Sequence, residues 1–329
     1  MLNRDMKLRE DIFEPKEMAA TRDGFGKGAV EAGRADERVL VLSADLAEST
    51  RAEWFQKEFP TRFVEMGVAE QNMATVAAGM ANYGKIPFIT SYAAFSPGRN
   101  WEQIRTTIAL NDVPVIICGM HAGVSVGPDG ATHQMLEDIA LMRAMPNMVV
   151  VSACDAEEAR KATIAAAKLG KPVYMRFGRE KTPVMTTAET PFEIGKANVI
   201  WKADAPRAAI FATGPLVHNA LLAARELEKS GIAVTVVDVH TIKPLDTETV
   251  AREAKAAGAA VTVEEHQIAG GLGGAIAEVL AGNAPVPIEF VGVHNRFGQS
   301  GTPTELIEHY GMNAEHIVEA VTKVSKRRA

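Results

Sequence analysis

The chain has 329 residues, of which 47% are hydrophobic and 23% charged, an ordinary globular composition with enough apolar material for two domains. Its formal net charge of −6 mixes both signs along the sequence, so no basic stripe could neutralise a phosphate backbone and we expect no nucleic-acid partner. No apolar run approaches the length of a membrane span, residues 1–18 lack the apolar region of a signal peptide, and Cys118 and Cys154 lie in apolar surroundings, so we expect no membrane association and a cytoplasmic location.

Short β-branched runs alternate with amphipathic segments through the first half of the chain. This alternation predicts parallel strands joined by helices, which is an α/β fold. The run VPVIICG at 113–119 is apolar throughout, as is typical of a central strand buried on both faces. The predicted strands are residues 39–43, 86–91, 113–119, 148–151 and 173–176.

A polar stretch with two prolines interrupts the alternation around residues 181–191 and is the best candidate for a domain boundary. Beyond it the pattern restarts as a second, smaller α/β unit. Its predicted strands are 208–212, 233–238, 260–264 and 286–291, and its predicted helices are 217–229, 247–256 and 273–280. We therefore predict two doubly wound α/β domains, residues 1–187 and residues 188–329.

A glycine-rich run, GGLGG at residues 270–274, opens a predicted helix after a strand, as a phosphate-binding loop does. It departs from the G-x-G-x-x-G spacing and lacks an acidic residue about 20 positions further on. We interpret these residues as turn glycines.

His121, Asp129 and His133 lie in a glycine-rich segment directly after the apolar strand 113–119. Open α/β sheets bind ligands at the carboxyl ends of their strands, and the glycines predict a loop around a small polar substrate. A metal site and a purely structural loop are the alternatives.

Glu70 begins a helix whose remaining surface is almost wholly apolar. A glutamate in the first helical turn commonly only compensates the helix dipole. A carboxylate buried in such apolar surroundings needs a further reason, which the neighbouring residues suggest.

Three motifs together closely resemble the transketolase family in order and spacing. They are GVAEQNM at 67–73, PFITSYAAF at 87–95 and GPDGATHQ at 127–134. Further matches extend the resemblance over nearly the whole chain: ATR at 20–22, SADLAES at 43–49, YMR at 174–176 and VDVHTIKPLD at 237–246. The resemblance implies a pyrimidine-binding domain followed by a transketolase C-terminal domain.

In that family an N-terminal domain binds diphosphate and a divalent metal through a Gly-Asp-Gly motif with a downstream Asn. The Asp-Gly pairs of this sequence, at 23–24 and 129–130, fall inside other family motifs. The resemblance therefore implies the C-terminal subunit of a split transketolase. We expect activity only with an N-terminal partner subunit, which would hold Mg²⁺ or another divalent ion, in a heterotetramer with two copies of each subunit.

The resemblance also implies how the cofactor, thiamine diphosphate, would be bound. Glu70 would place its carboxyl group at N1′ of the aminopyrimidine, and Tyr92 and Phe95 would flank that ring. Plain core packing is the alternative for the two aromatic residues. The segment SPGRN at 96–100 is about one residue longer than is typical of the family, so this wall of the cofactor site could differ locally.

By the same resemblance, Glu70, His121 and His133 are the candidate catalytic residues, since imidazoles suit proton transfer. Arg22, Ser49 and Arg176 match positions that hold the distal phosphate of the sugar, and arginine forks suit that task. The candidate substrate-binding residues are Arg22, Ser49, His121, Asp129, His133 and Arg176.

The implied reaction is the transfer of a two-carbon ketol unit from a ketose phosphate to an aldose phosphate, as in the pentose phosphate pathway. Two other functions stay open. One is a deoxyxylulose-phosphate-synthase-like or specialised-sugar transferase, and the other is a non-catalytic regulatory subunit that kept the fold.

Overall fold

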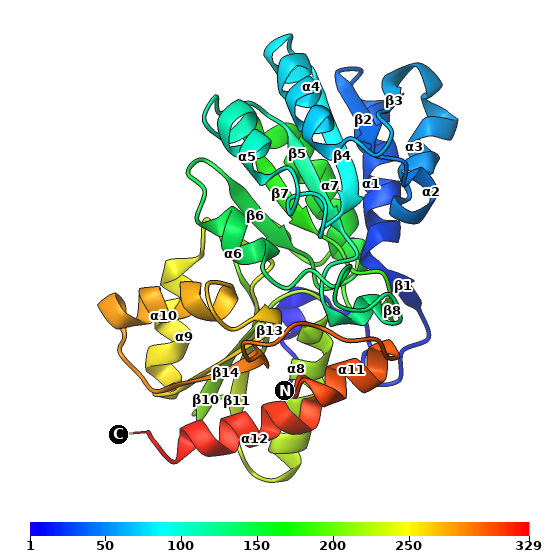
Figure 1. Ribbon diagram of the computed structural model, residues 1–329. Coiled ribbons are helices and arrows are strands. Elements are labelled where there is room, and N and C mark those ends of the chain that lie inside the picture. The colour runs from blue at the N-terminus through cyan, green and yellow to red at the C-terminus, as the bar shows by residue number, and fades with distance from the viewer. Residues whose placement is uncertain (329) are drawn as a thin grey trace.

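Two open β-sheets, each with helices on both faces, organise the computed structural model, which describes residues 1–328 (Figure 1). The larger sheet lies in the upper unit of Figure 1 and the smaller one in the lower unit. This arrangement confirms the predicted α/β fold of two doubly wound domains.

The larger sheet has seven strands in the order β12-β6-β7-β5-β4-β2-β3, all parallel except β12. Its strands are β2 (Val39–Ser43), β3 (Phe63–Glu65), β4 (Ile86–Tyr92), β5 (Ile116–Met120), β6 (Val149–Ser152), β7 (Val173–Arg176) and β12 (Thr241–Lys243). The central strands β4 and β5 are almost fully buried, as is typical of strands covered on both faces.

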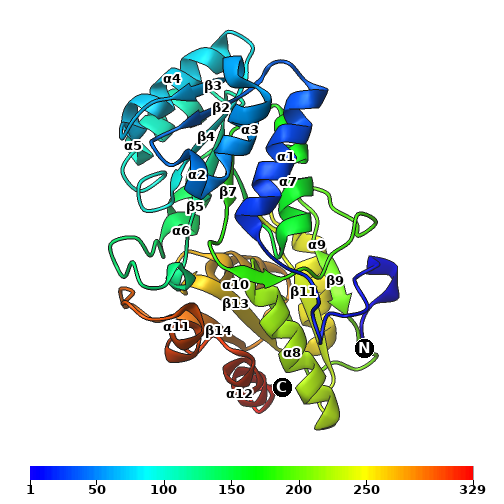
Figure 2. The same cartoon turned by 90° about the vertical axis from the view of Figure 1, so that its right-hand side faces the viewer.

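Helices cover both faces of this sheet. They are α1 (Thr21–Ala35), α2 (Ala47–Thr50), α3 (Ala52–Glu58), α4 (Glu70–Asn82), α5 (Trp101–Gln103), α6 (Asp138–Arg143) and α7 (Ala156–Leu169). Short 3-10 turns occur at Arg4–Met6, Pro60–Arg62 and Val124–Val126, and a π-helical turn at Ile104–Ala109. Helices α1 and α7 lie side by side on one face (Figure 2), where Phe25 and Ala159 enter the core, while α4 packs Met73 on the other.

The smaller sheet has five strands in the order β14-β13-β10-β11-β9, and β9 is antiparallel to its neighbour. Its strands are β9 (Asn198–Trp201), β10 (Ala208–Ala212), β11 (Val234–Asp238), β13 (Ala260–Gln267) and β14 (Ile288–Val293). Its helices are α8 (Leu216–Lys229), α9 (Thr247–Ala257), α10 (Leu272–Asn283), α11 (Pro303–His309) and α12 (Ala314–Ser325). None of the helices within residues 1–328 combines the length and apolar character needed to cross a bilayer.

The chain crosses between the two units more than once. The N-terminal residues pack on the second unit, where the Asn3 amide donates to the Ile200 carbonyl at 2.9 Å and Ile12 enters the core. Strand β1 (Met18–Ala20) then pairs with β8 (Lys181–Pro183), and β12 returns from the second half to the larger sheet. The predicted domain boundary between residues 187 and 188 therefore stays a prediction. Residues 1–13, which come before it in the sequence, pack with the second domain.

Candidate active site

Most of the polar residues singled out in the sequence gather around the carboxyl ends of β4 and β5. These strands are neighbours in register, with Tyr92 of β4 opposite Met120 of β5, and His121 follows immediately. Because parallel strands end at the same edge of a sheet, side chains that are distant in sequence meet there.

Glu70 is the first residue of α4, and its side chain is only 2% exposed. Its Oε1 atom accepts a hydrogen bond from Ser91 Oγ at 3.4 Å. Its Oε2 atom is buried with no hydrogen-bond partner among residues 1–328, and the nearest cation, Arg99 Nη1, lies 3.6 Å away. A buried polar atom without a partner is costly, so this oxygen is suited to a group supplied by a ligand.

The segment of residues 96–100 forms one wall of the Glu70 site. Asn100 Nδ2 donates to the backbone carbonyl of Glu70 at 3.1 Å and to Ser96 Oγ at 3.2 Å, which fixes the first turn of α4. The Arg99 guanidinium lies 5.5 Å from the ring centre of Phe95, and its Nη1 atom lies 3.6 Å from Glu70 Oε2. This segment therefore lies directly beside the carboxylate.

A connected set of rings links the Glu70 region to the histidines. Tyr92 stacks on His121 with ring centres 4.3 Å apart and lies 6.2 Å from Phe95. Phe95 meets His133 edge to face at 5.4 Å. Four predicted site residues therefore form one continuous aromatic wall.

Arg22, near the start of α1, also contacts this group of residues, through His121. Its Nη1 atom donates to the Ser49 carbonyl oxygen at 2.8 Å and lies 2.9 Å from His121 Nε2. Burial, followed by the charges of Arg22 and Arg179, lowers the pKa of His121 to about 3. This imidazole is therefore uncharged near neutral pH.

Arg179 is a site residue that the sequence interpretation missed. It donates to the Val126 carbonyl at 2.9 Å and pairs with Asp129 Oδ1 at 3.3 Å, beside the loop that carries His133. The pair is partly exposed, so both side chains can turn toward a ligand. Its place in the sequence could have predicted it, because Arg179 follows β7, which is the neighbour of β5 in the sheet.

The structure places Arg176 apart from the other residues predicted to bind the substrate, in a buried ion pair with Asp138. Arg176 Nε donates to Asp138 Oδ2 at 2.8 Å, and its Nη2 donates to the Glu265 carbonyl oxygen at 2.8 Å. Burial opposes its charge, but Asp138 and Glu265 nevertheless raise the pKa of Arg176 above its ordinary value. The guanidinium is therefore committed to a buried junction of β7, α6 and β13.

The metal alternative for the substrate loop finds no support in the geometry. Within residues 1–328, potential metal-ligand atoms converge only at Cys154, Glu158 and Asp238, which are buried where the two domains meet. The two histidines and the aspartate of the loop form no such set. A small-molecule contact fits them better.

The glycine-rich run at 270–274 begins α10 and does not offer an open anion site. The Glu264 carboxylate already accepts hydrogen bonds from the amides of Leu272 and Gly273, at 2.7 and 2.8 Å. A protein carboxylate thus occupies the helix N terminus, in agreement with the interpretation as turn glycines.

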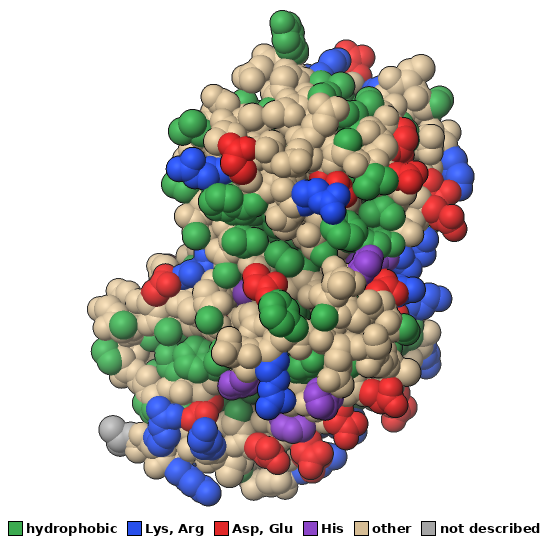
Figure 3. All heavy atoms as spheres, viewed as in Figure 1, with side chains coloured by type: hydrophobic (Ala, Val, Ile, Leu, Met, Phe, Trp, Pro, Cys, Tyr) green, Lys and Arg blue, Asp and Glu red, His purple; other side chains and the backbone are tan. Residues whose placement is uncertain are grey.

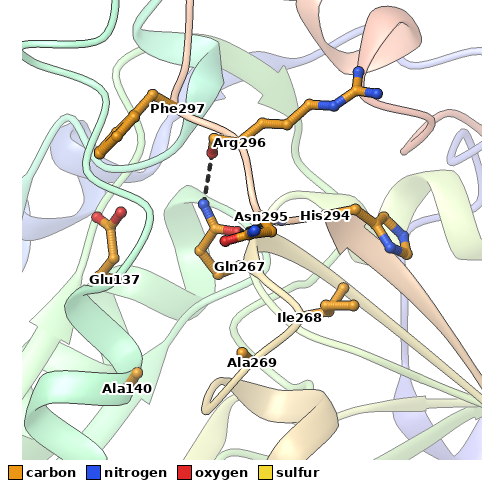
Figure 4. Close-up of a pocket in the computed structure, with 9 residues that line it drawn as sticks. All are labelled: Glu137, Ala140, Gln267, Ile268, Ala269, His294, Asn295, Arg296 and Phe297. Atoms are coloured by element: carbon orange, nitrogen blue, oxygen red, sulfur yellow. Dashed lines mark hydrogen bonds between the residues drawn. The ribbon is translucent and has the colours of Figure 1, made fainter.

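The hollow drawn in Figure 4 lies apart from the candidate site. It has a volume of about 640 Å³ and lies between α6 and the ends of β13 and β14. Gln267 closes part of it by donating to the Arg296 carbonyl at 2.7 Å, and the His294 side chain points away. None of the predicted site residues lines this pocket.

Comparisons with known proteins agree with the geometry. Residues 17–185 match the family model of the transketolase pyrimidine-binding domain, and residues 195–317 match that of the transketolase C-terminal domain. A protein of Methanocaldococcus jannaschii described as a transketolase C-terminal section is 43% identical, with 93% of this chain and 96% of the relative covered. A 6-deoxy-6-sulfo-D-fructose transketolase subunit of Clostridium sp. is 38% identical, with 93% and 95% covered.

A solved structure of a split-gene transketolase, described as an inactive beta4 tetramer, superposes with a TM-score of 0.88 at 43% identity. The match covers 94% of this chain and 99% of that chain. The chain therefore belongs to the transketolase family and corresponds to the C-terminal subunit of a split transketolase.

Proposed function

We propose that this subunit, joined to an N-terminal partner, transfers a two-carbon ketol unit from a ketose phosphate to an aldose phosphate with thiamine diphosphate. The observation that carries the proposal is the unpartnered, buried Oε2 of Glu70 at one end of the aromatic wall. When bound, thiamine diphosphate supplies the nucleophilic carbon and the electron sink that carbon–carbon cleavage requires.

The residues around Glu70 fit the pyrimidine end of that cofactor. Glu70 Oε2 is free to exchange a hydrogen bond with a ring nitrogen, while Ser91 fixes the orientation of the carboxyl group. Phe95 and Tyr92 provide flat apolar surfaces for an aromatic ring. In this proposal Arg99, whose guanidinium lies over Phe95, moves aside when the ring binds.

The polar residues beyond the aromatic wall fit a sugar phosphate. His121, His133 and Asp129 would contact its hydroxyl and carbonyl groups, since imidazoles and carboxylates are suited to them. Arg22 and Arg179, with Ser49 nearby, would hold the terminal phosphate in place of the originally predicted Arg176.

The partner would bring the diphosphate and Mg²⁺ ligands. No set of metal ligands in residues 1–328 lies at the candidate site. Figure 3 shows hydrophobic side chains at the surface of the face that carries α4 and α5. Val68 and Tyr83, at the two ends of α4, are largely exposed, which suits burial against other subunits in a heterotetramer with two copies of each.

Reconstitution tests the dependence on a partner. The chain alone should bind thiamine diphosphate weakly and transfer no ketol unit. Adding an N-terminal subunit with the Gly-Asp-Gly motif should give activity that saturates at equal amounts of the two subunits. Calorimetry and a coupled assay measure the two properties, with the partner alone as the control. Robust turnover by this chain alone would overturn the split-enzyme proposal.

The range of donor sugars is a separate question, raised by the Clostridium relative whose described substrate is a sulfosugar. Two arginines can hold a terminal sulfonate as well as a terminal phosphate, because both are anionic oxygen groups. Product analysis with xylulose 5-phosphate and with a 6-sulfo ketose would separate a general transketolase from a specialised one. Faster turnover of the sulfosugar would favour the specialised enzyme.

A further inference from the structure

The second domain supplies none of the predicted site residues, but it holds the loop that carries three of them. This substrate loop, residues 121–134, contains His121, Asp129 and His133. The Ser125 N–H donates to the Glu265 carboxylate at 2.6 Å. Just beyond the loop, the backbone N–H of Gln267 donates to the Leu136 carbonyl oxygen at 2.9 Å. Glu265 and Gln267 both belong to β13, so the second domain contacts the loop near each end.

The side-chain amide of Gln134 adds a third attachment, inside the loop. Its Nε2 atom donates to the carbonyl oxygens of Val124, Gly127 and Gln299, at 3.1, 3.0 and 2.9 Å. Val124 and Gly127 each begin a turn of the loop that is closed by the N–H group three residues later, and Gln299 belongs to the second domain. Carbonyl oxygens only accept hydrogen bonds, so the two hydrogens of this amide are shared among three acceptors. The buried amide of Gln134 therefore joins two turns of the loop to each other and to the second domain.

The second domain approaches the loop so closely that glycine is needed on both sides of the contact. A β-carbon at Gly298 would lie 1.7 Å from Gln134 Oε1, so any larger residue there would displace the amide. A β-carbon at Gly130 would lie 2.8 Å from Ser300 Oγ, and the φ of 75° at Gly130 also favours glycine. Residues 298–300 and the loop thus pack against each other at backbone distance.

We propose that Gln134 is a positioning residue through which the second domain sets the shape of the substrate loop. In this role its amide does not contact the substrate. It fixes the turn that carries Asp129, and this turn leads into His133, whose ring centre lies 5.4 Å from that of Phe95 in the aromatic wall. That the loop binds a sugar phosphate rests on the proposed function. The dependence of the loop on Gln134 does not, because it follows from contacts within this chain.

Hydrogen–deuterium exchange on the isolated chain tests this dependence without any need for turnover. Gln134→Met keeps the length of the side chain but has no N–H group. Backbone amides of residues 124–134 should exchange about tenfold faster in this variant, the effect of one hydrogen bond, while amides in the strands of both sheets keep their rates. Gln299→Ala is the matched control, because only the backbone carbonyl of Gln299 takes part, and its loop should exchange as in the wild type. An unchanged loop in folded Gln134→Met, or equally faster exchange throughout both domains, would overturn the proposal.

A substitution in the second domain should reproduce the effect, which also covers the case in which Gln134→Met does not fold. Gly298→Ala displaces the amide from the other side, so it should speed exchange in the same loop, and an unchanged loop would contradict the proposal. Gln134→Ala removes the group with which the new methyl would collide. Adding Gly298→Ala to Gln134→Ala should therefore change the loop little, whereas full additivity of the two effects would show that Gly298 does not act through the amide.

In the reconstituted enzyme the effect should fall on the substrate and not on the cofactor. Gln134→Met should raise KM for the ketose phosphate about tenfold. Its Kd for thiamine diphosphate, measured by calorimetry, should stay at the wild-type value, because Glu70 lies outside the loop. Weakening of both to the same degree would show general damage to the fold and would contradict a positioning role. If the wild-type complex shows no turnover, the proposed function fails while the exchange experiments still stand.

Discussion

A substitution at Glu70 can distinguish a catalytic subunit from a non-catalytic protein that has the same fold. If Glu70 serves the cofactor pyrimidine, Glu70→Gln keeps the shape and a hydrogen-bond donor but loses the transferable proton. We expect kcat of the reconstituted enzyme to fall by about 10²–10³, the usual cost of removing one preorganised group, with little change in KM. Steady-state kinetics measure both, and Glu37→Gln, at an exposed position, is the matched control. An unchanged kcat would show that Glu70 only begins its helix.

Some residues of the candidate site could be predicted from the sequence, and others could not. The transketolase-like motifs led to Glu70, and the ends of predicted strands led to His121. Arg176 and Arg179 are three residues apart in the sequence. Only the structure shows that the side chain of Arg176 is buried and that the side chain of Arg179 is partly exposed. The partner of Arg176 is Asp138, from a helix 38 residues earlier in the chain, and no local pattern predicts such a pairing. A motif identifies the residue types of a site, whereas long-range partners decide which of them can reach a ligand.

Secondary-structure elements were predicted best where local signals and burial agree. Strands 39–43, 173–176 and 208–212 have the bounds that the apolar runs indicate. The strand predicted at 113–119 begins only at Ile116, because Pro114 has no N–H for the ladder. Five short strands were not predicted: β1, β3, β8, β9 and β12. Of these, β1, β8 and β12 form only by pairing with a segment far away in the sequence.

The network around Arg176 joins elements of both domains and should contribute to stability. Arg176→Met would leave the Asp138 carboxylate buried without its cation, although Tyr174 still donates to it at 2.7 Å. We expect a loss of about 3–5 kcal/mol in the free energy of unfolding, measured by denaturant titration at fixed protein concentration. Adding Asp138→Asn should recover part of that loss, because the amide needs no cation. Unchanged stability together with a raised KM for phosphorylated sugars would instead return Arg176 to the substrate site.

At the scale of the whole molecule, the junction of the two domains contains a buried group of acidic side chains. Asp238 ends β11 in the second domain, and Glu158 lies in α7 of the first. Their carboxylate oxygens and the Cys154 sulfur lie within 4.8 Å of one another. Asp155 lies alongside but is satisfied by hydrogen bonds from the Met185 and Thr186 amides. Burial beside a second carboxyl group favours the protonated form of Asp238.

The pH dependence of stability should report the proton on Asp238. Burial, followed by the neighbouring Glu158, raises the pKa of Asp238 well above its ordinary value. A raised pKa means that its contribution to stability is complete below the unfolded value of about 3.9 and is lost as the pH rises through the folded value.

Asparagine is the neutral isostere of the protonated acid and does not titrate. The free energy of unfolding of Asp238→Asn should therefore match that of the wild type in acid. It should exceed the wild-type value increasingly from about pH 5 to 9, by at most ~1.4 kcal/mol per pH unit. Denaturant unfolding across that range measures the difference, and Asp204→Asn, on the surface, should show no such trend. A wild-type chain that instead gains stability over Asp238→Asn as the pH rises would show that Asp238 is ionised at the junction.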